Sequence, residues 1–101
     1  MNPKLKKKLR AIGHQLKPVV TVAGNGLSDG VVAEINRALD DHELIKIKIA
    51  GDRDDRIDVE LALADFEAAE IIQAIGGMLL VYRPSREVNP ALSNIARANV
   101  L

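Results

Sequence analysis

A strict alternation of apolar and charged residues runs through the segment ELIKIKIAG, residues 43–51. In an extended chain Ile45, Ile47 and Ile49 point to one side, whereas Lys46 and Lys48 point to the other. This pattern predicts a strand with one face in an apolar core and the other open to water. The fold must therefore contain a sheet from which two lysines project together.

The N-terminal segment predicts an amphipathic helix from about Pro3 to Gln15. Leu5, Leu9, Ile12 and Leu16 recur at spacings of four, three and four, which places them on one stripe of a helix. Packing this stripe against a core turns the cations of the segment outward as a group. These cations are Lys4, Lys6, Lys7, Lys8 and Arg10.

The remaining patterns predict an α/β sandwich with the order α-β-α-β-α-β-β. Strands are expected at 19–23, 43–51, 70–75 and 78–83, and further helices after a Ser28 cap and over 56–69. In the last of these segments Ile57, Val59, Leu61 and Leu63 also alternate as in a strand, but its length and its alanines and glutamates favour a helix. The Gly76-Gly77 turn makes the last two strands antiparallel, whereas the β-α-β connections favour parallel neighbours, so we expect a four-stranded mixed sheet with three helices. Residues 1–87 form the predicted domain, and 88–101 a C-terminal tail with room for one short helix.

The charges are unevenly distributed although the formal net charge is zero. Residues 1–20 hold six cations and no acid, whereas residues 29–70 hold thirteen acids and five cations. Such a chain can present a basic face and an acidic face, and a basic face is typical of proteins that bind a polyanion. The alternative is that the lysines only keep a surface helix soluble.

Residues that could carry catalysis are scarce. The 101 residues fit one domain, and the absence of cysteine excludes a disulfide framework and a thiolate metal site. His14 and His42 lie near predicted helix ends without metal-ligand spacing. Asp52, Asp54 and Asp55 lack the pattern of a calcium loop, so a solvated acidic turn is favoured over a cation site. We therefore expect no catalytic residue, no metal and no cofactor.

A glycine loop connects the first predicted strand to the second helix. Gly24, Gly26 and Gly30 give G-x-G-x-x-x-G, one residue longer than the dinucleotide fingerprint, with Asp52 as a conceivable ribose ligand. A loop before a helix N-terminus can also receive a phosphate of a nucleic acid, because free N–H groups and the helix dipole face it. A tight turn that only needs glycine is the third interpretation.

Three segments resemble the CRM domain, the chloroplast RNA splicing and ribosome maturation family, in its stand-alone bacterial YhbY-like form. They are LKPVVTVAGNGLSDGVV (16–32), HELIKIKIA (42–50) and IQAIGGMLLVYRPSRE (72–87). The resemblance implies a fold similar to the C-terminal domain of translation initiation factor three. It also implies RNA binding and, in bacteria, association with precursors of the large ribosomal subunit.

The resemblance further implies a G-x-x-G loop that grips an RNA backbone. Its four positions here are Ala23, Gly24, Asn25 and Gly26, so alanine replaces the first glycine. Alanine would be strained if position 23 needed positive φ, unless the turn shifts by one residue. The N–H groups of Asn25, Gly26 and Leu27 are the candidate phosphate donors.

The predicted partner is structured RNA, with contacts mainly to phosphate and sugar, because only Phe66 and Tyr82 are aromatic. We expect a cytoplasmic, monomeric, non-enzymatic protein that binds neither DNA nor a membrane. A protein-interaction module that uses the acidic middle segment and a nucleotide-binding enzyme fragment are the alternatives. The candidate RNA contacts are Lys4, Lys6, Lys7, Lys8, Arg10, Lys17, Gly24, Asn25, Gly26, Leu27, Lys46, Lys48, Arg83 and Arg86.

Overall fold

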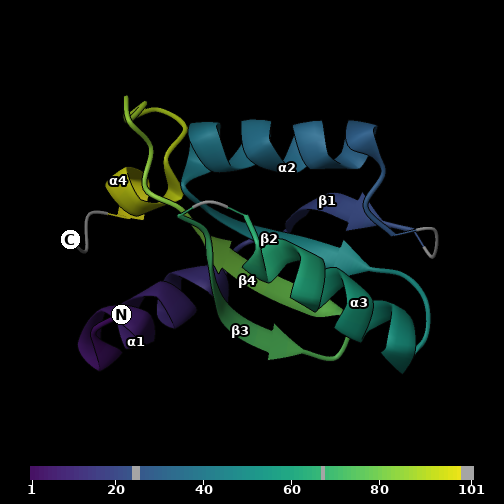
Figure 1. Cartoon of the computed structure of the whole chain (residues 1–101). Helices are drawn as coiled ribbons and strands as arrows, with labels where there is room; N and C mark the ends of the chain where they lie inside the picture. Colours follow the sequence, from purple (N-terminus) through teal and green to yellow (C-terminus); the bar gives the residue numbers. More distant parts are fainter. Residues whose placement is uncertain (24–25, 67, 99–101) are drawn as a thin grey trace.

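A computed structural model describes residues 1–23, 26–66 and 68–98, and it shows a mixed sheet with helices on both faces (Figure 1). The predicted order of elements is confirmed, and a short fourth helix lies in the C-terminal segment. The elements are α1 (Pro3–Gly13), β1 (Pro18–Val22), α2 (Asp29–His42), β2 (Leu44–Ile49), α3 (Arg53–Ala64), β3 (Glu70–Ile75), β4 (Met78–Tyr82) and α4 (Asn94–Ala98).

The four strands are arranged in the order β1-β2-β4-β3. β1 and β2 are parallel, as expected for strands joined through a helix, and β4 is antiparallel to both of its neighbours. β2 and β4 are therefore the central strands, and β1 and β3 are the edges. The predicted mixed sheet is confirmed.

Two apolar cores lie on opposite faces of this sheet. On one face α2 and α3 cover Ile45, Ile47 and Ile49 of β2, which are almost completely buried. On the other face α1 and α4 cover a smaller core that includes Leu44 and Leu80. Figure 1 shows α1 on the opposite side of the sheet from α2. The prediction that one face of β2 lies in an apolar core is confirmed, but the other face is only partly open to water, because Leu44 is buried in the second core and Lys46 is half-buried.

Helix α3 differs from its predicted bounds because of its N-terminal cap. Asp52 accepts a hydrogen bond from the backbone N–H of Asp55 at 3.0 Å, and Asp55 accepts one from the N–H of Asp52 at 3.0 Å. This reciprocal capping box starts the helix at Arg53 rather than Arg56. The helix then ends at Ala64 rather than at Ala69.

The C-terminal segment is held against the junction of α2 and β2. Three consecutive residues there bind three consecutive residues at the start of α4, two before it and its first residue, in each case through a side chain. His42 Nδ1 donates to the carbonyl of Leu92 at 2.9 Å, Ser93 Oγ donates to Glu43 Oε1 at 2.7 Å, and Asn94 Nδ2 donates to the carbonyl of Leu44 at 2.7 Å. The segment that was predicted as a tail therefore contributes α4 to the second core, through Ile95.

Candidate nucleic-acid interface

The packing of α1 determines where its cations point. Asn2 caps the helix by accepting from the N–H of Lys4 at 2.7 Å, and Pro3 occupies the first turn. Leu9 and Gly13 are buried against the sheet. Gly13 lies so close to β4 that a Cβ atom on it would be 2.5 Å from Leu80 Cδ2. With this side against the sheet, the charged side must face outward.

The candidate cations of α1 and β2 lie on the same side of the sheet. Lys46 and Lys48 alternate with the isoleucines that face α2 and α3, so they point to the side covered by α1. Among these cations, Lys4, Lys7, Lys8 and Lys48 are exposed, and Lys6, Arg10 and Lys46 are half-buried; Lys17, in the connection that follows α1, is also exposed. We call these eight residues the basic face.

The opposite side of the sheet carries most of the acidic residues. The sequence of α2 holds four acids and one arginine, and that of α3 holds four acids and two arginines. The sequence of α1, by contrast, holds no acid. The separation of charge along the chain thus becomes a separation across the sheet.

The glycine loop begins directly after β1, and its described part is a tight turn. The N–H of Gly26 donates to the carbonyl of Ala23 at 3.0 Å, and Gly26 has a φ of 79°. Ala23 is not among the described non-glycine residues with positive φ, so it carries no left-handed strain. Gly24 and Asn25 lie outside the described residues.

The turn changes the predicted set of phosphate donors. The N–H of Gly26 is engaged within the turn, so it is not the free donor that the sequence suggested. The side chain of Leu27 packs against the first core, which anchors the loop at the start of α2. Ser28 caps α2 as predicted, accepting from the N–H of Val31 at 3.3 Å.

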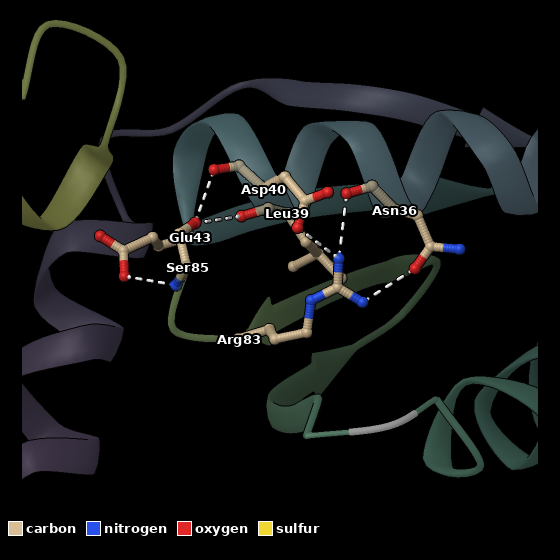
Figure 2. Close-up of polar contacts among 6 residues, drawn as sticks. All are labelled: Asn36, Leu39, Asp40, Glu43, Arg83 and Ser85. Atoms are coloured by element: carbon tan, nitrogen blue, oxygen red, sulfur yellow. Dashed lines mark hydrogen bonds and ion pairs between the residues drawn. The ribbon is translucent and has the colours of Figure 1, made fainter. Parts of the chain in front are cut away.

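Arg83 and Arg86 follow β4 and lie apart from the basic face. The guanidinium of Arg83 donates to Asn36 Oδ1 at 2.8 Å and to the Asn36 carbonyl at 3.0 Å, and it pairs with Asp40 at 3.0 Å (Figure 2). Three contacts with α2 occupy it, so its evident role is to hold the end of β4 against α2. Arg86 is exposed beside a cavity that Arg83 and Asp40 also line.

A buried carboxylate that the sequence did not single out lies beside Arg83. Glu43 is 6% exposed and has a φ of 63°. Its Oε2 accepts from the N–H of Ser85 at 3.0 Å (Figure 2), and its Oε1 accepts from Ser93. The pKa of Tyr82 is raised above its usual 10.0 by burial and by the charge of Glu43. The only signal in the sequence is an acid directly before an apolar strand, which does not predict burial.

The candidate catalytic and metal-binding residues have structural explanations. The pKa of Asp52 is lowered, chiefly by the hydrogen bond from the backbone N–H of Asp55. Within the described ranges no group of three acidic or histidine side chains could hold a metal ion. His14 caps the end of α1, and His42 binds the C-terminal segment. Among the residues that the structure describes, no helix is long and apolar enough to cross a bilayer.

The chain is similar to several proteins that are named for RNA binding. A probable RNA-binding protein of Pseudomonas aeruginosa is 52% identical over 93 residues, which cover 91% of this chain and 89% of that protein. An RNA-binding protein of Haemophilus influenzae is 46% identical over 88 residues, covering 86% and 89%. A probable RNA-binding protein of Bacillus subtilis is 33% identical over 85 residues, covering 83% and 88%. These names describe binding rather than a reaction, which confirms the expectation of a non-enzymatic protein.

The fold has a counterpart among solved structures. The solution structure of a Staphylococcus aureus protein, described as a candidate RNA-binding protein, has a TM-score of 0.73 and 28% sequence identity. The match covers 86% of this chain and 92% of that one. Residues 1–83 match the CRS1 / YhbY (CRM) domain, which is the family that the three segments resembled. The chain therefore belongs to the CRS1 / YhbY (CRM) domain family.

Proposed function

We propose that this protein binds structured RNA through the basic face and, without catalysing a reaction, assists the assembly of the large ribosomal subunit. The observation that carries the proposal is the separation of charge across the sheet. Seven cations from α1 and β2 lie on one side of the sheet, with Lys17 in the connection after α1, whereas α2 and α3 place their acids on the other. A surface with this charge distribution attracts a polyanion and orients it.

The RNA-binding part of the proposal is supported by the relatives and by the position of the glycine loop. Proteins that cover most of this chain are named for RNA binding. The turn closed by Gly26 lies between β1 and the N-terminus of α2, and the dipole of α2, rather than the engaged N–H of Gly26, is what would favour a phosphate there. The role in ribosome assembly depends on the resemblance to the YhbY-like family, whose bacterial members associate with large-subunit precursors.

The test is an affinity titration of a ribosomal RNA hairpin at several salt concentrations. Four to six phosphate contacts would give a log-log slope of about −3 to −5. Replacing Lys6, Lys7 and Lys8 by glutamate should abolish binding while the fold persists, because Lys7 and Lys8 are exposed on α1 and none of the three side chains is fully buried. Affinity that does not change with salt, or that survives the triple substitution, would contradict the proposal.

A matched control is available on the other side of the sheet. Replacing Arg37, Arg53 and Arg56 by glutamate makes the same change in net charge, but on α2 and α3. Even the shortest dimension of the molecule, 22 Å, exceeds the Debye length of about 8 Å at physiological salt. The control variant should therefore keep most of its affinity. An equal loss in both variants would indicate a response to net charge alone.

One observation favours a second candidate, a protein-interaction module. Ile57 and Leu61 are 41% and 65% exposed on α3, and exposed Asp54, Asp58 and Asp65 lie at helical spacing beside them. A basic ribosomal protein could dock on such a face. Co-sedimentation with large-subunit precursors before and after ribonuclease treatment distinguishes the two candidates. Association that survives ribonuclease would favour the protein partner.

A further inference from the structure

Four side chains form a row across the whole sheet. Thr21 of β1 is the register partner of Lys48, Lys48 is the partner of Met78, and Met78 is the partner of Ile75. Residues directly opposite each other on neighbouring strands point to the same face. We call these four residues the open row.

The open row lies on the side of the sheet that α1 occupies. Lys48 is flanked by Ile47 and Ile49, which belong to the core under α2 and α3. Met78 is two residues from Leu80, which belongs to the core under α1. The alternation of side chains along each strand therefore directs the row toward the basic face.

Helix α1 covers the other end of this face and leaves the open row accessible. The close approach of Gly13 to Leu80 shows that the helix crosses the sheet two residues after Met78 along β4. In the row itself Ile75 is 63% exposed, Thr21 and Lys48 are exposed, and Met78 is half-buried. Ile75 and Met78 thus offer an apolar surface next to the amine of Lys48.

The row is continuous with the basic face at one side and with the glycine loop at another. Lys46 of the basic face is two residues from Lys48 on the same side of β2, and Ala23 at the start of the loop is two residues from Thr21. A polyanion on the basic face would therefore reach the row without bending around the molecule.

We infer that the open row receives an unpaired nucleotide, so that the preferred RNA combines a paired stem with a bulge or a loop; this rests on the proposed function. In a stem the base faces are stacked, so only an unpaired base can lie flat on apolar side chains. Ile75 and Met78 would contact the base, and Lys48 would contact a phosphate next to it. The cations of α1 would contact the stem.

The test compares two RNA duplexes with the same number of base pairs, one fully paired, the other with one unpaired nucleotide bulged from a strand. Affinities are measured by fluorescence anisotropy. The unmodified protein should bind the second RNA about three- to tenfold more tightly, as expected for burial of one apolar contact. Ile75→Ser should remove this preference without changing the salt slope, whereas Lys48→Ala should reduce the slope by about 1 for the bulged RNA.

Controls separate a lost contact from a lost fold. Leu61→Ser removes a side chain that is 65% exposed, but on α3 at the opposite face, and it should keep the preference. Ile75→Thr retains a β-branched residue for the strand and should still lose the preference. Circular dichroism checks that each variant is folded.

The outcomes distinguish this inference from the proposed function. Equal affinity of the unmodified protein for both RNAs, or a preference that survives in both Ile75 variants, would overturn the inference and leave RNA binding by the basic face intact. The second result would show that the preference comes from contacts outside the open row. Failure to bind either RNA would overturn the proposed function and the inference together.

Discussion

The contact between α1 and β4 predicts opposite effects for two glycine-to-alanine substitutions. A Cβ atom on Gly13 would lie 2.5 and 2.8 Å from the two Cδ atoms of Leu80 and 3.2 Å from its Cγ. Unstrained carbon contacts are about 3.5–4.0 Å, so Leu80 would have to move by about 1 Å. Because Leu80 is 2% exposed in a packed core, it has little room to do so.

We expect Gly13→Ala to lower the free energy of unfolding by about 1–2 kcal/mol. Overpacking costs about 1–3 kcal/mol, and the better helix propensity of alanine returns less than about 1 kcal/mol at the last residue of a helix. Gly30 in the first turn of α2 is the matched control, since its Cβ would meet no atom within 4 Å. Gly30→Ala should raise stability by about 0.5 kcal/mol.

Urea unfolding followed by far-UV circular dichroism measures both variants. The midpoint should fall for Gly13→Ala and rise slightly for Gly30→Ala, with the slope unchanged in each case. Equal shifts in the same direction would refute the reasoning, because they would mean that α1 does not lie as close to β4 as this structure places it. The outward direction of the α1 cations would then lose its structural basis.

Three further predictions concern the loop, the C-terminal segment and the cap of α3. Gly26→Ala should cost about 1–2 kcal/mol because of its φ of 79°, and Gly26→Asn should cost less, as measured by thermal unfolding; equal losses would contradict a left-handed requirement at this position. Ser93→Ala removes the hydroxyl bound to the buried carboxylate of Glu43 at 2.7 Å and should cost about 1–3 kcal/mol in urea unfolding; unchanged stability would show that this bond is not needed. The pKa of Asp52 is below its usual 3.8, so its contribution to stability is present above that pH and is lost as the pH falls through the lower value in the folded state. Asp52→Asn should therefore reduce the loss of stability on acidification, and an identical pH profile would contradict the assigned cap.

The fold could be predicted from the sequence wherever a pattern is local. The alternation along 44–49, the leucine stripe before Pro18 and the Ser28 cap each depend on residues a few positions apart, and the structure confirms all three. The third helix was ambiguous because four apolar residues alternate there as in a strand, at positions 57, 59, 61 and 63. Two of these residues, Ile57 and Leu61, do not face the core. Both are exposed on α3, and a capping box starts the helix, which is again a local signal.

The candidate site was only partly predictable, because its members come from distant parts of the chain. The sequence named the cations but did not show that those of α1 and β2 share one side of the sheet. It grouped Arg83 with them, whereas the structure pairs that guanidinium with Asn36 and Asp40, more than 40 positions earlier. The turn that engages the N–H of Gly26 was also not evident from the loop sequence.

The sequence by itself determined the types of the elements, the outward direction of the α1 cations and the presence of two oppositely charged parts. Periodicity, caps and turn residues involve positions close together in the chain, so these signals can be recognised from the sequence before the fold is known. Only the tertiary structure decided that β2 places its lysines beside α1, that Glu43 is buried beneath the C-terminal segment and that Thr21, Lys48, Met78 and Ile75 align. Those relations depend on strand register and on which helix covers which face, and these are set by packing between segments far apart in the chain.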